Sequence, residues 1–315
     1  MLISLILCSY NTSKELLERA FSSFNGFKNQ EFELVLINDG SDEWHTSELV
    51  RMIGASSFEF EVKLFTIQNI GLAAARNFGM QKSTGTYIGF MDSDDYYYIP
   101  DVFNEVTNLE KNVDVIDFSV STITNDFSQR ETINPNMTLT TNDEVLHYFS
   151  SLLKENKYFA PAQYRVYLKS YLMKNNLFFY EGIFHEDEEW MPRIFISASS
   201  MKVSSVISYR HYQTTHTSIT RSQDSSMREK RAVGLLTATN SMIDLSTNMR
   251  GELRRNFRNY IVKTYLQIPI HSSDIKLNRL LPLKFSNEPA TFMKSLLFLF
   301  GNQFYLWTRS LIKGS

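Results

Sequence analysis

The composition of this chain is that of a globular protein with nearly balanced charge. Its 315 residues carry a formal net charge of -2, and 43% of them are hydrophobic. This length suits one large domain, or one domain with a smaller appendage. A nucleic-acid binder usually shows a basic excess, so we expect no nucleic-acid partner. The lone cysteine, Cys8, leaves no intrachain disulfide and no thiolate metal site, and it indicates a reducing compartment.

The first eight residues are apolar and resemble a signal peptide at first sight. They lack a positively charged start and a small-residue cleavage site, and their apolar run is too short to span a bilayer. A buried first strand explains them better. We therefore expect a cytoplasmic protein.

The N-terminal part alternates between strand patterns and helical patterns. Short apolar runs predict strands at 2–8, 32–37, 62–67 and 87–91. Apolar spacing or alanine-rich composition predicts helices at 14–24, 47–53 and 72–82. This order predicts an α/β fold in which helices cover both faces of a parallel sheet.

Polar and turn-forming residues follow each predicted strand. They are Ser9-Tyr10-Asn11, Asn38-Asp39, Gln68-Asn69 and Asp92-Ser93-Asp94. Open α/β sheets bind their ligands at the carboxyl ends of the strands. We therefore expect these side chains to gather at one edge of the sheet and to form a ligand site.

The acidic stretch Asp92-Ser93-Asp94-Asp95 follows the fourth predicted strand. Alternate residues of an extended chain point the same way, so the carboxylates of Asp92 and Asp94 converge. Their repulsion is relieved by a divalent cation, because Mg²⁺ and Mn²⁺ prefer oxygen ligands. The alternative interpretation is an acidic turn that caps the next helix.

The pattern is less regular in the second half of the chain. Residues 113–122 and 202–212 have strand character, and 226–270 is typical of helix. We predict two domains, at 1–221 and 222–315. Residues 295–308 hold no charge and many large apolar side chains. Two alternatives stay open for this segment: a helix docked on the core, or an interfacial helix through which 294–313 would contact a membrane.

Four motifs stand in order along the N-terminal part. They are Ile6-Leu7-Cys8-Ser9-Tyr10-Asn11, Leu36-Ile37-Asn38-Asp39-Gly40-Ser41, Asn69-Ile70-Gly71 with Ala75-Arg76-Asn77, and Phe90-Met91-Asp92-Ser93-Asp94-Asp95. Together they resemble the family-two inverting glycosyltransferases, especially those that build bacterial surface polysaccharides. The resemblance implies a GT-A fold, which is Rossmann-like with a mostly parallel sheet, followed here by a helical extension. In that family the last motif is the metal-binding DxD motif.

Three later segments extend the resemblance. The run His185-Glu186-Asp187 is similar to the family's Glu-Asp segment, Tyr209-Arg210 with 218–221 resembles a loop over the donor, and Gln163-Tyr164 faintly resembles a segment near the acceptor. The surrounding aromatic residues suit sugar stacking, but we favour a core role for them. Two departures are Cys8, where the family usually has proline, and Asn38, which replaces a frequent aspartate.

The resemblance implies that Asp187 is the catalytic base of an inverting transfer. Its acidic neighbours would raise its proton affinity by repulsion. The alternative is an acidic helix start that complements the helix dipole, and Glu186 is the nearest competitor as base.

The donor-binding residues implied by the resemblance surround the acidic motif. They are Cys8, Ser9, Tyr10, Asp39, Arg76, Asp92, Ser93 and Arg210, with Asp94 and Asp92 as ligands of Mn²⁺ or Mg²⁺. We expect Asp95 to support the ligands or cap a helix, Arg76 to hold Asp92 and Asp39, and Asp39 to accept a uracil N–H, which favours UDP. Arg221 is expected to be ordinary surface charge. His211 and His216 are expected to be exposed loop residues, although the resemblance leaves open that they ligate metal.

The sequence thus predicts a glycosyltransferase that moves a hexosyl or N-acetylhexosaminyl group from a nucleotide sugar to a saccharide or a lipid-linked saccharide. It would act on a surface glycan at the inner face of the cell membrane. One alternative is a sugar-nucleotide nucleotidyltransferase, but the segment Ser9-Tyr10-Asn11-Thr12-Ser13 lacks the glycine and arginine expected there. The other is a non-catalytic sugar-nucleotide-binding subunit.

Overall fold

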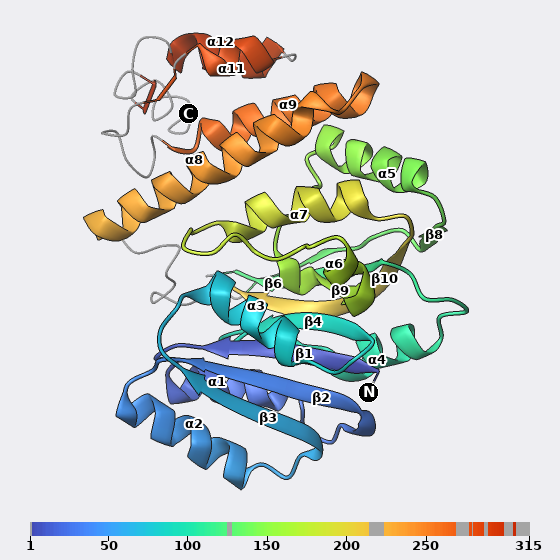
Figure 1. Ribbon diagram of the computed structural model, residues 1–315, viewed down its shortest axis with the longest axis vertical. Helices are drawn as coiled ribbons and strands as arrows, with labels where there is room; N and C mark the ends of the chain where they lie inside the picture. Colours follow the sequence, from blue (N-terminus) through green and yellow to red (C-terminus); the bar gives the residue numbers. More distant parts are fainter. Residues whose placement is uncertain are drawn as a thin grey trace. The chain divides into compact units, whose positions relative to one another are not determined.

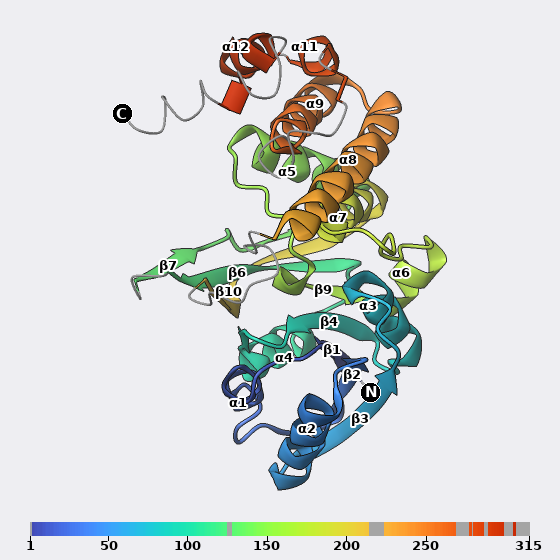
Figure 2. The ribbon, with the colours of Figure 1, turned by 90° about the vertical axis from the view of Figure 1, so that its left-hand side faces the viewer.

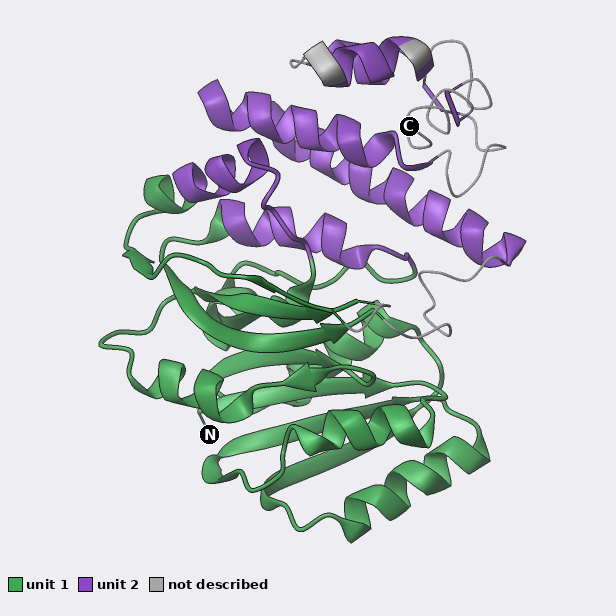
Figure 3. Cartoon of the chain, turned by 180° about the vertical axis from the view of Figure 1, so that it is seen from behind, with its two compact units in different colours: residues 1–145, 161–182, 197–216 green, residues 146–160, 183–196, 217–315 purple. Residues whose placement is uncertain are grey.

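The chain forms two compact units, which Figure 3 shows in two colours. The computed structural model describes residues 2–124, 128–213, 224–268, 277–278, 280–286, 289–298 and 305–306. The first unit comprises 1–145, 161–182 and 197–216, and the second comprises 146–160, 183–196 and 217–315. Two segments that precede the predicted boundary at 221 thus group with the C-terminal helices, and the domain limits stay a prediction.

The first unit contains every strand of the described chain. Its elements are β1 (Ile3–Ser9), α1 (Lys14–Ser22), β2 (Lys28–Asp39), α2 (Glu43–Ala55), β3 (Glu59–Ile67), α3 (Leu72–Lys82), β4 (Tyr87–Asp92), β5 (Tyr96–Tyr97), α4 (Ile99–Thr107), β6 (Val115–Ile123), β7 (Gln129–Thr132), β8 (Met137–Leu139), the 3-10 helix η1 (Ala162–Tyr164), β9 (Arg165–Leu168), α6 (Lys169–Lys174) and β10 (Met201–Tyr212). The strands and helices predicted up to residue 91 are all present.

The strands form one mixed sheet in the order β3-β2-β1-β4-β9-β6-β10-β5 (Figure 1). Strands β1 to β4 pair in parallel, as predicted. Strand β9 runs antiparallel between β4 and β6, and β5 runs antiparallel to β10. The α/β prediction is confirmed, but the sheet is not parallel throughout, because its second half is built around β9.

Helices cover both faces of this sheet (Figure 2). On β1, Ile3, Leu5 and Leu7 point to one face and join a hydrophobic cluster with α1, α2 and α4. Ile6 points to the other face, towards α3, where an added Cβ at Gly79 would come within 2.5 Å of Ile6 Cγ2. Helix α3 therefore packs closely on the strands that precede the acidic motif, and this fixes the position of its own side chains.

The second unit is helical in its described parts. It holds most of α5 (Asn142–Lys154), with α7 (Glu186–Ser197), α8 (Ser225–Thr247), α9 (Gly251–Tyr265), α11 (Leu281–Phe285) and α12 (Pro289–Phe298). The helical pattern predicted at 226–270 is two helices in sequence. The rings of Phe149 and Phe195 stack with centroids 4.7 Å apart, which ties α5 to α7.

The predicted membrane-contact segment 294–313 lies largely outside the described residues. Only its start falls in α12, and residues 299–304 and 307–313 are not described. Over the described ranges, the helices are all too short or too polar to cross a bilayer. A second cluster joins apolar residues of α8, α9, α11 and α12, including Leu235, Tyr265, Phe285 and Phe298.

A buried ionic cluster joins β1, β2 and β3 in the first unit. The Glu33 side chain is fully buried and pairs with Lys63 at 2.6 Å. It also accepts hydrogen bonds from Ser4 Oγ and from the backbone N–H of Thr84. Burial alone would raise the pKa of Glu33, but the bonds from Lys63, Ser4 and Thr84 outweigh burial and hold this pKa below its ordinary value.

Because the folded-state pKa of Glu33 is lowered, its charge stabilises the protein above the ordinary carboxyl pKa and ceases to do so as the pH falls through the folded value. We expect Glu33→Gln to lower the free energy of unfolding by about 2 kcal/mol near neutral pH, since it leaves Lys63 without its partner.

The difference between Glu33→Gln and the parent protein should shrink as the pH falls through the lowered pKa of Glu33, as urea denaturation at several acidic pH values would measure. Glu31→Gln, on the same strand but exposed, is the matched control and should change little. A difference that stays constant with pH would contradict the ionic origin of the effect.

Candidate active site

The carboxyl ends of β1, β2 and β4 lie side by side. In the strand register Cys8 is opposite both Ile37 and Asp92, and Ser9 is opposite Asn38. The predicted donor residues Cys8, Ser9, Asp39 and Asp92 therefore share one edge of the sheet, as expected from the strand order. Tyr10 follows them and is 50% exposed, which leaves its ring available to a ligand.

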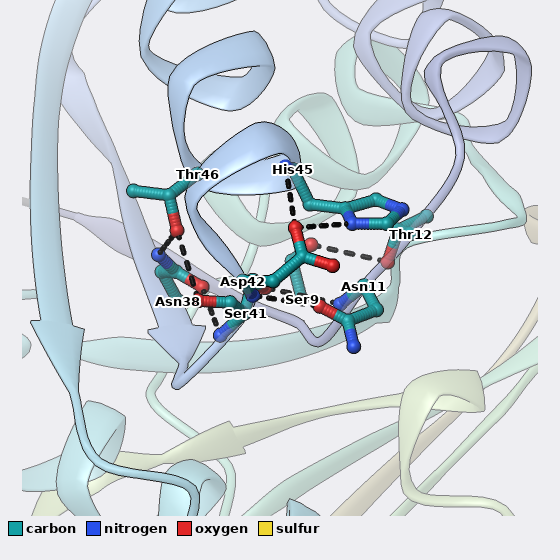
Figure 4. A network of polar contacts seen from close by, with 8 residues as sticks. All are labelled: Ser9, Asn11, Thr12, Asn38, Ser41, Asp42, His45 and Thr46. Carbon is teal, nitrogen blue, oxygen red and sulfur yellow. Dashed lines mark hydrogen bonds and ion pairs between the residues drawn. The ribbon is translucent and has the colours of Figure 1, made fainter.

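A network of polar contacts holds the two turns that leave β1 and β2 (Figure 4). Asn38 is fully buried, and its side chain accepts from Ser41 N and donates to Thr46 Oγ1. Asn11 N donates to Ser41 Oγ, and Asp42 N donates to Asn11 Oδ1. Asn38 thus shapes the turn itself, so the aspartate that it replaces is not needed to form it.

Asp39 is buried and bonded to the backbone that begins α3. Its carboxylate oxygens accept from Ile70 N at 2.8 Å and from Gly71 N at 3.0 Å. Burial nevertheless raises the pKa of Asp39. Gly40 has a φ of +73°, and a Cβ there would lie 2.4 Å from Asn69 N, so the turn requires glycine. Asp39 thus links the second motif to the third, through Ile70 and Gly71. Its contact with uracil stays a prediction.

Asp92 is held on both of its carboxylate oxygens. Arg76 donates to Oδ1 at 2.9 Å, and Gln163 Nε2 donates to Oδ2 at 2.5 Å. Arg76 is almost fully buried on α3, and its guanidinium lies near the rings of Phe90 and Phe179. Burial raises the pKa of Asp92, and the Arg76 charge opposes this rise. The predicted hold of Arg76 on Asp92 is thus present in the structure.

Gln163 is a site residue whose contact with Asp92 sequence reasoning missed. It lies on η1, is buried, and leaves its Oε1 atom without a hydrogen-bond partner among the described residues. The resemblance of Gln163-Tyr164 to a family segment pointed to this stretch, but no local pattern links it to a residue 71 positions earlier.

Asp95 binds to strand β10 and does not cap a helix. Its carboxylate accepts from Tyr209 Oη at 2.8 Å and from Tyr212 N at 2.7 Å, and it contacts His211 Nδ1 at 3.0 Å. The next helix, α4, has Tyr98 as its N-cap. The capping prediction is therefore wrong, because the turn after β4 delivers Asp95 to β10 before α4 begins.

Asp94 and Ser93 complete the acidic motif. Ser93 Oγ lies 2.8 Å from Thr12 Oγ1, and Arg19 donates to the Asp94 carbonyl. Burial, together with repulsion from Asp95 and Asp92, raises the pKa of Asp94 to about 7. A cation would relieve this repulsion, and the oxygen donors suit Mg²⁺ or Mn²⁺.

The described part of the chain holds no group of three or more His, Cys, Asp or Glu side chains arranged to hold a metal ion. Asp94 and Asp92 therefore fit a metal ion only as a partial ligand set, which leaves further positions for oxygens of a bound ligand.

Arg210 and His211 lie on strand β10, not on a loop as predicted. The Arg210 guanidinium lies over the rings of Tyr96 and Tyr98, at 5.8 and 5.2 Å from their centroids. His211 is partly buried, and burial opposes but does not cancel the rise in its pKa caused by Asp95. The other two loop candidates, His216 and Arg221, lie outside the described residues.

Asp187 lies in the first turn of α7, in the second unit, as its helix-start prediction expects. Glu188 accepts from Tyr260 on α9, and Glu189 pairs with Arg193 and accepts from Ser241 on α8. In the acidic run Glu186-Asp187-Glu188-Glu189, the last two carboxylates thus contact helices α7, α8 and α9.

The residue before this helix has an unusual backbone. Among the described non-glycine residues, those with positive φ are three asparagines and His185, whose φ is 62°. Such strain is concentrated at functional sites.

The contacts of Asn77 show what the asparagine of the third motif does in this structure. Its side chain donates to the Phe179 carbonyl and accepts from Phe179 N, and it also donates to Glu181. Helix α3 therefore places Arg76 on Asp92 and fixes the segment that precedes Asp187 in sequence.

Open α/β sheets bind their ligands at the carboxyl ends of the strands, so this edge, with its paired carboxylates and buried arginine, is the candidate ligand site. The profile described as "Glycosyl transferase family 2" matches residues 4–175. The chain belongs to this family.

Curated relatives agree with the family assignment. The uncharacterized glycosyltransferase YibD of Escherichia coli is 26% identical over 189 residues, which are 57% of this chain and 52% of YibD. An uncharacterized glycosyltransferase of Haemophilus influenzae is 42% identical over 96 residues, which are 30% of this chain and 37% of that protein. The chain spans about half or less of these relatives' own lengths.

Solved structures share the fold over nearly the whole chain. Staphylococcus aureus TarS in complex with UDP-GlcNAc has a TM-score of 0.58 and 16% identity, covering 98% of this chain and 92% of that one. The mannosyltransferase PcManGT of Pyrobaculum calidifontis, in complex with GDP-Man and Mn²⁺, has a TM-score of 0.54 and 12% identity, covering 98% and 83%. The predicted GT-A fold is confirmed.

The contact between Arg76 and Asp92 can be tested by a double-mutant cycle. We expect Arg76→Met to lower the free energy of unfolding by about 2–4 kcal/mol, because it leaves the Asp92 charge without its partner. Adding Asp92→Asn should restore about 1 kcal/mol or more of that loss.

Urea denaturation of the four proteins measures this coupling energy. The surface pair of Arg51, which is exposed, and Glu48, which is partly buried, is the control and should couple much more weakly. Additive losses at Arg76 and Asp92 would show that the two side chains do not interact.

Proposed function

We propose that this glycosyltransferase moves a sugar from a nucleoside diphosphate to an acceptor hydroxyl with inversion. The donor is a UDP-sugar, and the transferred group is a hexose or an N-acetylhexosamine. The observation that carries this proposal is the gathering of Asp92, Asp94, Ser9 and the Asp39 turn at one sheet edge, with Arg76 bound to Asp92. A diphosphate and its counter-ion suit such an edge.

In this proposal the donor binds at the carboxyl ends of β1, β2 and β4. Tyr10 packs against the nucleoside, and the turn after β2 lines the site next to Tyr10. Cys8, Ser9 and Ser93 contact the nucleotide, and Arg210 contributes positive charge from β10. The UDP-GlcNAc in the TarS complex supports the choice of a UDP-sugar, and the GDP-Man in the PcManGT complex supports the wider class.

Asp94, assisted by Asp92, holds Mn²⁺ or Mg²⁺. The ion supplies Lewis-acid stabilisation of the negative charge that grows on the leaving diphosphate. Arg76 and Gln163 orient Asp92, and Arg76 adds a fixed positive charge that no proton equilibrium removes near neutral pH.

Asp187 is the general base in this proposal. It takes the proton from the acceptor hydroxyl as the oxygen attacks the anomeric carbon from the side opposite the diphosphate. The position of Asp187 in the first turn of α7 supports this choice, as does the strained backbone of His185, which directly precedes the helix.

The acceptor is a saccharide or a lipid-linked saccharide of a bacterial surface glycan, and the reaction takes place at the cytoplasmic face of the membrane. The four ordered motifs support this assignment through their resemblance to polysaccharide-building enzymes.

A panel of sugar nucleotides tests the function directly. We expect one UDP-sugar with Mn²⁺ to raise the melting temperature more than the others do, since a ligand bound only to the folded state stabilises it. The same donor should be slowly hydrolysed. If neither nucleoside diphosphate sugars nor Mn²⁺ change melting or are consumed, the proposal fails.

Asp94→Ala should weaken Mn²⁺-dependent donor binding by about tenfold or more, because it removes the proposed metal ligand. Calorimetric titration of UDP with and without Mn²⁺ measures the effect. Asp101→Ala, an exposed aspartate on α4, is the control and should bind like the parent protein. Equal Mn²⁺ dependence in the parent and in Asp94→Ala would refute the ligand assignment.

Asp187→Asn should reduce kcat by about 10²–10⁴, the usual contribution of a general base, with nearly unchanged donor affinity. The measurement is transfer rate beside donor titration. Glu186→Gln distinguishes the nearest competitor and should keep most of the activity. Near-normal turnover in Asp187→Asn, with loss in Glu186→Gln, would move the base to Glu186.

A further inference from the structure

Helix α12 exposes large apolar side chains and buries small polar ones. Its small polar residues Thr291 and Ser295 are 3% and 0% exposed, whereas Phe292 and Met293 are 45% and 55% exposed. Ser295 Oγ donates to the Thr291 carbonyl and lies 2.7 Å from Ser286 Oγ, so the inward face satisfies its own hydroxyl groups.

The outward apolar face continues beyond these two residues. Leu296 is partly exposed on α12, and Leu280, just before α11, is 67% exposed. Lys284 and Lys294 are exposed on the same two helices. Large apolar side chains that share an exposed surface with lysines are typical of helices that lie in a membrane interface.

A pair of arginines on α9 lies beside α11. Helices α11 and α12 lie on the same side of α9 within the second unit (Figures 1 and 2). The Arg258 guanidinium lies over the ring of Phe285 on α11, at 4.8 Å from its centroid. Arg254 is one turn away on the same helix face.

The charges of this arginine pair are uncompensated. Within the described ranges, neither Arg254 nor Arg258 has an acidic partner, and the Nε atom of each is buried without a hydrogen bond. Burial and the neighbouring Arg254 charge lower the pKa of Arg258.

Basic residues are also enriched in the C-terminal part of the sequence. Residues 222–315 contain 14 of the 32 Lys and Arg residues but only 6 of the 34 Asp and Glu residues. This region is therefore strongly basic, while residues 1–221 carry an acidic excess. A basic end on a protein whose total charge is near zero indicates an anionic partner.

We propose that the surface formed by Leu280, Phe292, Met293 and Leu296, with Lys284, Lys294, Arg254 and Arg258 as its basic residues, is a docking surface for an anionic lipid bilayer. The apolar side chains enter the interface between headgroups and acyl chains, and the basic residues bind lipid phosphates. This surface overlaps the membrane-contact segment expected from the sequence, 294–313, only at Lys294 and Leu296, because its other residues lie between 254 and 293. It does not depend on the transferase chemistry, because binding needs neither donor nor acceptor.

Vesicle co-sedimentation of the full chain tests this docking surface. We expect binding to vesicles that contain phosphatidylglycerol and at least about tenfold weaker binding to phosphatidylcholine alone. Raising the salt from about 0.1 M to about 1 M should weaken binding, as the Debye length falls to about 3 Å. Absence of binding, or equal binding to both kinds of vesicle, would overturn the proposal.

Two variants separate the apolar and ionic parts. Phe292→Ser combined with Met293→Ser and Leu296→Ser should reduce binding about tenfold or more, and so should Arg254→Gln with Arg258→Gln. Ile133→Ser, which removes an exposed apolar side chain from the first unit, is the matched control and should bind normally. Parent-like binding by both multiple variants would also overturn the proposal.

The competing occupant of this surface is a second copy of the chain. Sedimentation velocity without lipid distinguishes it. A dimer that the triple serine variant dissociates, in a protein that binds no vesicles, would identify a contact between copies and reject the lipid assignment. Melting temperatures close to the parent value show that loss of binding is not loss of folding.

Discussion

The ion pair between Arg76 and Asp92 is the interaction on which the candidate site depends. Burial disfavours a charged Asp92, and Arg76 opposes that effect from a position that is itself almost fully buried. Gln163 and the Tyr209 hydroxyl then bind the Asp92 side chain and backbone N–H. The side chain and backbone of Asp92 thus connect α3, η1 and β10 to the end of β4, so the position of this residue is defined from three directions.

The elements nearest the N-terminus were predictable because their signals are local. Each strand from β1 to β4 is an apolar run, and α3 begins at Leu72 and ends at Lys82, as its composition indicates. The gathering of Ser9, Asp39 and Asp92 also followed from strand order, since parallel strands end at the same edge. Pattern and topology were sufficient here.

The roles of Gln163, Asp95 and Arg210 were not predictable, because they depend on strands that pair across long sequence separations. Asp95 reads as a helix cap from its neighbours, but its partners on β10 are more than 110 residues away. Arg210 and His211 lie in the strand predicted at 202–212, but its neighbours β6 and β5 follow only from long-range pairing. Similarly, the acidic run after His185 reads as uniform in the sequence, whereas in the structure Glu188 bonds to Tyr260 and Glu189 pairs with Arg193.

The antiparallel strand β9 has a consequence for the order in which the sheet is completed. Strands β1 to β4 lie within the first 92 residues and pair with one another, whereas β9 is formed by 165–168 and β10 by 201–212. On a ribosome, the edge of β4 therefore has no partner until about 70 further residues have been made. An open strand edge is a template for wrong pairing. Chains that end before β9 should thus expose the β4 edge, and the 3-10 helix η1, which directly precedes β9, also carries the Gln163 that binds Asp92.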